Sequence, residues 1–83
     1  MELWEAPVAA SAHRHGITED DTRHVLRNLV AVATDPGDDD VTLFLGPDRA
    51  ANLIEVGVLA TDDGPVIIHA MAARGRHFRT PKE

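Results

Sequence analysis

The fold of this chain is decided by residues 53–71, which read LIEVGVLATDDGPVIIHAM. Apolar and β-branched residues predominate at positions 53–60 and again at 66–71, and the polar turn Asp62-Asp63-Gly64-Pro65 separates the two runs. Short β-rich runs bounded by Gly, Pro and Asp are typical of strands joined by tight turns. This stretch therefore predicts two adjacent antiparallel strands.

Two further strands are expected upstream of this pair. Val and Thr alternate with Ala over residues 30–34, and Pro36-Gly37 then marks a turn. Residues 41–45 form another β-rich run, which Gly46-Pro47-Asp48 closes. Four strands joined by short turns predict a four-stranded antiparallel β-meander.

Two helices are expected before the strands. Pro7 suits the first turn of a helix and Gly16 suits its end, so an alanine-rich first helix is predicted over residues 7–15. Thr18 and Asp21 resemble a capping box that opens a second helix over residues 19–28. Its inward face is predicted from helical spacing to be Thr22, Val25, Leu26 and Leu29.

The predicted fold class is accordingly α+β, with two N-terminal helices packed on a four-stranded antiparallel β-meander. The chain after Arg74 is either a short C-terminal helix or a loose tail. Eighty-three residues leave room for a single domain, 1–83. A chain this small buries a modest share of its surface, so we expect it to associate with itself or with a partner.

Composition limits the classes of protein to which the chain can belong. It contains no Cys, which excludes a disulfide framework and a cysteine-based zinc site. No apolar run approaches the roughly 20 residues that cross a bilayer. Glu2 and Glu5 stand where a signal peptide would be positively charged. The sequence therefore predicts a cytoplasmic protein without membrane association.

The net charge of −6 is unevenly distributed. Residues 1–65 carry four Arg against thirteen Asp and Glu, whereas residues 66–83 carry four Arg and Lys against one Glu. Proteins that bind phosphate backbones usually present a basic surface, and only the C-terminal segment offers one here. The acidic body favours a partner with a basic face.

His69 and Glu55 interrupt the two apolar runs that decide the fold. Strand alternation predicts that His69 shares a face with Ile67 and Met71. It is then either a hydrogen-bonded core residue or a proton donor and acceptor that faces a groove. Glu55 lies opposite Ile54 by the same rule, so if Ile54 faces the core, Glu55 points to solvent or to a site.

A basic cluster follows His69, and its members are Arg74, Arg76, His77 and Arg79. Arginines could hold a phosphate bidentately while a histidine moves protons, which is the chemistry that RNA cleavage requires. The alternative is a solvated tail, or an anchor for an acidic surface.

Metal binding is not predicted. The run Asp38-Asp39-Asp40 lacks the alternating spacing and the distal Glu of a calcium loop, so a solvated hairpin loop is expected there. His13 and His15 stand two residues apart and would not share a helix face. The sequence predicts neither a metal site nor a cofactor.

Several segments resemble the BrnT-type toxins, a branch of the RelE-like ribonucleases of bacterial toxin–antitoxin pairs. Trp4-Glu5 is similar to the Trp-Asp start of that family, and Arg14-His15-Gly16-Ile17 is similar to its turn between two helices. The expected order of helices, four-stranded meander and basic C-terminus also agrees. Met71, in His69-Ala70-Met71, stands where the family tends to have Arg, and Arg74 could supply that guanidinium.

The resemblance implies a small, metal-independent endoribonuclease that receives RNA on the open sheet face and is neutralised by an antitoxin protein. Together with the cluster, it gives these candidate catalytic residues: His69, Arg74, His77, Glu55 and His15. The candidate substrate-binding residues are Arg14, Arg74, Arg76 and Arg79. The alternative function is a non-catalytic interaction or homodimerisation module on the same fold, which the acidic charge favours.

Overall fold

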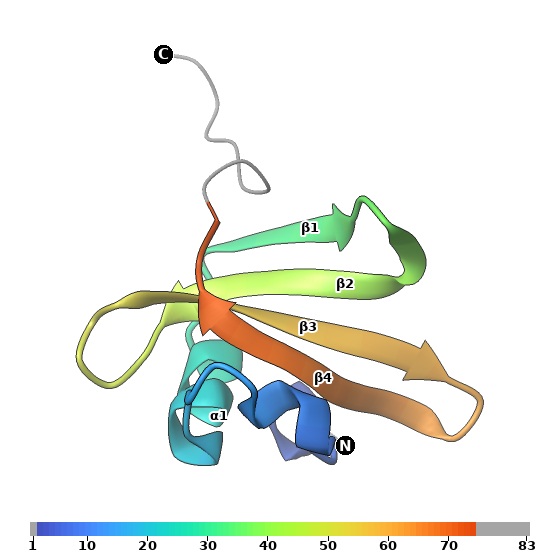
Figure 1. Cartoon of the computed structure of the whole chain (residues 1–83), viewed down its shortest axis with the longest axis horizontal. Coiled ribbons are helices and arrows are strands. Elements are labelled where there is room, and N and C mark those ends of the chain that lie inside the picture. Colours follow the sequence, from blue (N-terminus) through green and yellow to red (C-terminus); the bar gives the residue numbers. More distant parts are fainter. Residues whose placement is uncertain (1, 75–83) are drawn as a thin grey trace.

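The chain forms a four-stranded antiparallel sheet with an α-helix against one face, and the computed structural model describes residues 2–74 (Figure 1). The helix is α1 (Glu19–Arg27). The strands follow in the order β1-β2-β3-β4 across the sheet. Their bounds are β1 (Ala31–Asp35), β2 (Asp38–Pro47), β3 (Leu53–Thr61) and β4 (Gly64–Ala72). The α+β class and the antiparallel meander are therefore confirmed.

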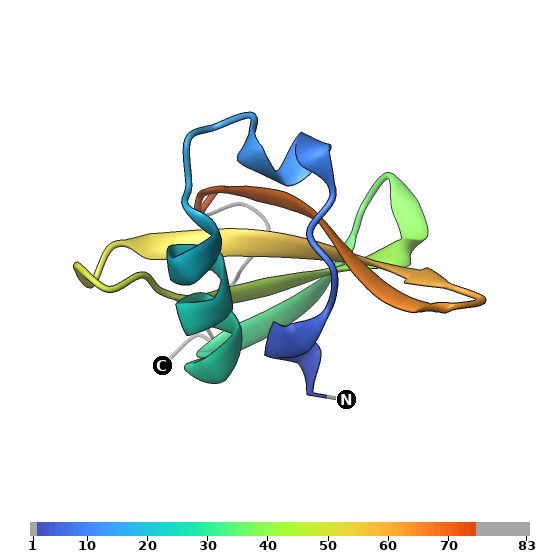
Figure 2. The same ribbon diagram turned by 90° about the horizontal axis from the view of Figure 1, so that it is seen from below.

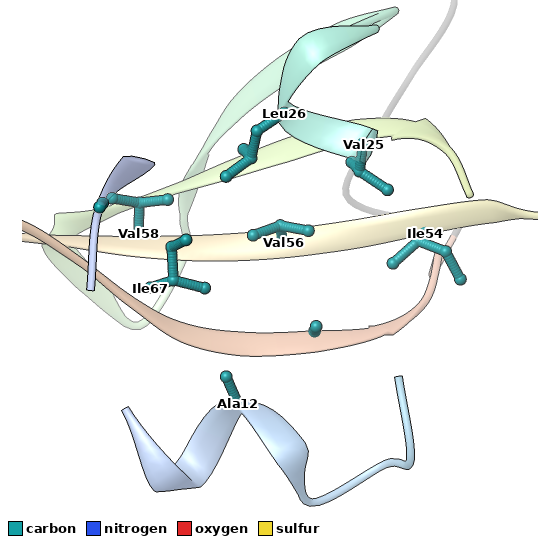
Figure 3. Packing of buried hydrophobic residues seen from close by; sticks show 9 residues of the cluster. Ala12, Val25, Leu26, Ile54, Val56, Val58 and Ile67 are labelled. Atoms are coloured by element: carbon teal, nitrogen blue, oxygen red, sulfur yellow. The ribbon is translucent and has the colours of Figure 1, made fainter. Parts of the chain in front are cut away.

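The hydrophobic core lies between α1 and the sheet (Figure 3). Val25 and Leu26 of α1 face β3, where every second residue is apolar and buried. The face of the sheet that carries Ile54 is therefore the face that α1 covers. Nine buried residues make up this core: Ala6, Ala12, Val25, Leu26, Ile54, Val56, Val58, Ile67 and Ala70.

The prediction of a first helix over residues 7–15 is wrong. The segment instead contains two short 3-10 helices, η1 (Leu3–Glu5) and η2 (Ala10–His13), so α1 is the one α-helix in residues 2–74. Between them, the Ala9 N–H donates to the Ile67 carbonyl at 2.8 Å and the Ile67 N–H donates to the Pro7 carbonyl at 2.8 Å. These bonds hold residues 7–9 extended along β4, which outweighs the helix propensity of the alanines. Figure 2 shows this segment crossing the sheet on the side of α1.

The second predicted helix is present and ends at Arg27. Thr18 caps it, because its hydroxyl accepts a hydrogen bond from the Asp21 N–H at 3.1 Å. Thr22, Val25 and Leu26 are buried as expected. Leu29 is 40% exposed, contrary to the prediction, because the helix has ended before it and the chain is turning into the sheet.

Asp21 ties α1 to the turn between β2 and β3. Its Oδ1 atom accepts hydrogen bonds from the backbone N–H of Arg49 at 3.0 Å and from Arg49 Nε at 2.8 Å. The Arg49 side-chain hydrogen bond is the main cause that lowers the pKa of Asp21 from 3.8 to about 2. The ionised carboxylate therefore stabilises the fold at neutral pH.

We expect Asp21→Asn to destabilise the protein at neutral pH and to lose that effect in acid. Since the folded pKa is depressed, the stabilisation is complete above about pH 4 and disappears as the pH falls through about 2. Urea denaturation at about pH 7, 4 and 2 measures this difference. Asp39→Asn, in the exposed β1–β2 hairpin, is the control for the charge change. If the stability difference between the wild type and Asp21→Asn did not shrink in acid, the role of the carboxylate charge would be contradicted.

Asp38, Asp39 and Asp40 lie in the first part of β2 and are exposed, so they belong to the strand rather than to a hairpin loop. No helix within residues 2–74 combines the length and the apolar character needed to cross a membrane. The short helix considered as an alternative after Arg74 falls outside the described residues.

Candidate functional site

A fully buried carboxylate lies on the sheet face opposite α1. Glu55 is the third residue of β3, next to Leu45 of β2 and Met71 of β4, and its exposed fraction is 0%. The sequence predicted that Glu55 would point away from the Ile54 face, and the register confirms this orientation. The side chain does not reach solvent, so a charged partner is required to hold it there.

That partner is Arg74, which follows the end of β4. Its Nη2 and Nε atoms donate to Glu55 Oε2 at 2.6 and 3.1 Å, and its backbone N–H donates to Oε1 at 2.8 Å. The Ala73 N–H also donates to the Leu53 carbonyl, which holds the chain beside β3. Arg74 thus meets the carboxylate with both its guanidinium edge and its main chain, an arrangement that combines charge with fixed geometry.

His69 of β4 is the third member of the site. Its Nε2 atom lies 3.0 Å from Glu55 Oε2. Gly57 is its cross-strand neighbour on β3, and a Cβ atom there would come within 3.0 Å of the His69 Cβ. The absence of a side chain at Gly57 therefore lets the imidazole lie close against β3.

The prediction that His69 shares a face with Ile67 is wrong. A register shift between Gly57 and Val58 pairs Val58 with Ile67 and Gly57 with His69, so Ile68 is an extra residue in β4. Such a β-bulge interrupts the alternation of faces. Ile67 consequently enters the core beneath α1, while His69 reaches Glu55 on the other face.

The charge state of Glu55 follows from two opposing effects. Burial disfavours the ionised carboxylate and raises its pKa, whereas hydrogen bonds from the Arg74 side chain and backbone, and from His69, lower it. The hydrogen bonds prevail, and the pKa of Glu55 lies below its ordinary value. The Glu55 hydrogen bond in turn raises the pKa of Arg74. The pair is therefore ionised at neutral pH.

His15 brings a second imidazole to the site. The ring centroids of His15 and His69 are 6.0 Å apart and the ring planes meet at 77°. His15 follows η2, which is joined to β4 where the Ser11 hydroxyl donates to the Ile68 carbonyl at 2.7 Å. We call the four residues Glu55, His69, Arg74 and His15 the Glu55 cluster.

The structure thus brings together four of the candidate residues that the sequence indicated. Arg14 precedes His15 in the same exposed turn. Arg76, His77 and Arg79 fall outside the described residues. What the sequence reasoning missed was the pairing of Glu55 with Arg74. The signal that could have found it is a single Glu within an apolar strand, with an Arg directly after the neighbouring strand.

The Glu55 cluster can orient an imidazole. A carboxylate that contacts one ring nitrogen fixes the ring position and its tautomer, which leaves the other nitrogen for chemistry. His69 is 25% exposed at its side chain and Arg74 is 36% exposed, so solvent reaches both, whereas Glu55 is closed off. Comparison with protein-family models, with curated proteins and with solved structures found no match.

Proposed function

We propose that this chain is the toxin component of a bacterial type II toxin–antitoxin system, with a RelE-like fold and metal-independent endoribonuclease activity. The observation that carries the proposal is the 3.0 Å contact between the buried carboxylate of Glu55 and the partly exposed imidazole of His69. A carboxylate-oriented histidine is a recurring proton-transfer device. The resemblance of the Arg14-His15-Gly16 turn to BrnT-type toxins points to the same chemistry.

The proposed reaction is transesterification at an RNA phosphate. His69 accepts the proton of the 2′-hydroxyl, the 2′ oxygen bonds to phosphorus, and the bond to the 5′ oxygen breaks. His15 or water returns a proton to that leaving oxygen. Arg74 and Arg14 stabilise the charge that develops on the phosphate oxygens. Since Glu55 already engages the Nε and Nη2 atoms of Arg74, this arginine is foremost a positioning residue for Glu55.

We expect His69→Gln to lose most of the ribonuclease activity while keeping the fold. General acid–base catalysis contributes about 10²–10⁴-fold, so cleavage should fall by about 100-fold or more. The measurement is viable count and total-RNA integrity after tightly controlled induction in a bacterial host. Cleavage of RNA by the purified protein in the presence of a chelator then tests independence from metal.

His13→Ala is the matched control. His13 is exposed at the end of η2, so this variant should retain full activity. Circular dichroism verifies that each variant folds. Normal growth and intact RNA on soluble expression of the wild-type chain would contradict the ribonuclease proposal.

The second candidate is a non-catalytic interaction module, with an antitoxin-like protein or a second copy as partner. Two observations favour it: Glu55 neutralises the Arg74 guanidinium, and the chain carries a net charge of −6, which opposes RNA binding. This function predicts a protein that leaves RNA intact and forms a stable complex. The induction experiment above separates the two candidates.

A further inference from the structure

Within residues 2–74, the outer edge of β1 has no neighbouring strand. β1 is the first strand of the sheet and pairs with β2 on one side only. The one charged residue of β1 is Asp35 at its end; residues 29–34 before it contain no charge and no proline, and Val30 and Val32 are 64% and 58% exposed. Natural proteins usually protect free edges with charges, prolines or covering segments, because exposed N–H and C=O groups recruit further strands.

The other edge of the sheet shows such protection. The segment Pro7–Ala9 lies along β4 and exchanges two backbone hydrogen bonds with Ile67, both at 2.8 Å. Ser11 adds a hydrogen bond to the Ile68 carbonyl. Of the two edges in the described part of the chain, β4 is therefore covered and β1 is left open (Figure 1).

The side chains on β1 are suited to an apolar neighbour. Val32 pairs across the strands with Phe44, which is half-buried and packs against the core. Phe44 in turn pairs with Val56, so Val32 extends the core-facing row of side chains to the edge of the sheet. An apolar residue on an added strand would pack beside Val32 and bury its exposed surface.

Charge indicates what kind of strand would bind. The strand ends that flank the β1–β2 turn are acidic, and residues 28–48 contain no Arg, Lys or His. The four acidic residues at this end of the hairpin are Asp35 of β1 and Asp38, Asp39 and Asp40 of β2. A second copy would also carry a net charge of −6, whereas a basic partner would complement this acidic hairpin end.

We propose that the open edge of β1 binds an extended segment of a partner protein by strand addition. The segment carries apolar residues at alternate positions, which pack beside Val32, and Lys or Arg at the end that lies next to the acidic hairpin end. Main-chain hydrogen bonds supply affinity in this mode of recognition, and the side chains supply specificity. The proposal does not depend on ribonuclease activity, since β1 contributes no residue to the Glu55 cluster.

The test is a selection from a phage-displayed library of random ten-residue peptides against the full chain at low salt. We expect the enriched peptides to combine alternating apolar residues with Lys or Arg at one end. Val32→Lys should weaken binding of a synthetic enriched peptide by about tenfold or more, because it places a like charge on the edge. Amide NMR shifts caused by that peptide should concentrate in β1.

Two controls separate this surface from other effects. Leu53→Lys makes the same charge change at a similarly exposed residue of the inner strand β3, and should change affinity by less than about twofold. His69→Gln should bind the peptide unchanged even if RNA cleavage is lost. The proposal would be overturned if the enriched peptides bound Val32→Lys as well as the wild type, or if the selection enriched no peptide with basic residues. It would also be overturned if the wild-type chain were a dimer that Val32→Lys converts to a monomer.

Discussion

Replacement of Arg74 by Met is expected to destabilise the protein by about 2–3 kcal/mol. The substitution removes the guanidinium that meets Glu55 at 2.6 Å and leaves a carboxylate with 0% exposure without its cationic partner. Breaking a fully buried ion pair costs about 3–5 kcal/mol. The smaller value is expected here because the Arg74 side chain is 36% exposed and its backbone N–H still donates to Glu55. Urea denaturation at neutral pH measures the loss.

Arg49→Met is the matched control for the Arg74 variant. Arg49 also pairs with a carboxylate, Asp21, but its side chain is 56% exposed, and exposed pairs contribute little. A clearly smaller loss of stability is therefore expected. Equal losses in the two variants would contradict the structural importance of burial at Glu55.

The loss of stability in Arg74→Met should also depend on pH. The pKa of Glu55 is lowered in the folded protein, so the pair stabilises the fold above the ordinary pKa of 4.5 and less so as the pH falls below it. Without Arg74, burial raises the pKa of Glu55 with less opposition. The stability difference between wild type and Arg74→Met should therefore be largest at neutral pH and shrink in acid. A difference that does not shrink in acid would contradict an ionised Glu55 in the native protein.

Replacement of Gly46 by Ala is expected to cost about 3 kcal/mol of stability, at the upper end for overpacked sites. A Cβ atom on Gly46 would lie 2.8 Å from the carbonyl oxygens of Val25 and Asn28. Both oxygens belong to the backbone at the end of α1, so neither can move away without shifting the helix from the sheet. Thermal denaturation, followed by circular dichroism, measures the loss.

Gly37→Ala provides the comparison for this substitution. A Cβ at Gly37 would lie 3.4 Å from a side-chain oxygen of Asp35, an ordinary contact in an exposed turn, so a small change is expected. A wild-type-like stability of Gly46→Ala would show that α1 does not sit against β2 at this distance.

Local sequence signals predicted most of the secondary structure. The alternation of apolar residues and the Pro36-Gly37 and Gly64-Pro65 turns located the four strands to within a few residues. Thr18 located the start of α1, because its capping hydrogen bond is made within the first helical turn. These signals act between residues close in sequence, which is why they could be recognised without the fold.

Contacts between distant segments account for the incorrect predictions. Residues 7–9 have the composition of a helix, but hydrogen bonds to Ile67, almost sixty residues later, hold them extended. The bulge at Ile68 depends on the pairing of β4 with β3, so strand alternation alone wrongly placed Ile67 on the same face as His69. Propensity is weak compared with hydrogen bonds and burial that the tertiary structure supplies.

The candidate site, too, depends partly on local sequence signals and partly on contacts between distant segments. The sequence by itself determined the residue types, the α+β class and the order of strands, because apolar periodicity and turn chemistry are local properties. Only the tertiary structure decided that Glu55, His69 and Arg74 meet, since a carboxylate on β3 can reach Arg74 only when β4 is paired in this register. The physical reason is that a buried charge must find its partner across the sheet, and the register that brings them together is set by the packing of the whole chain.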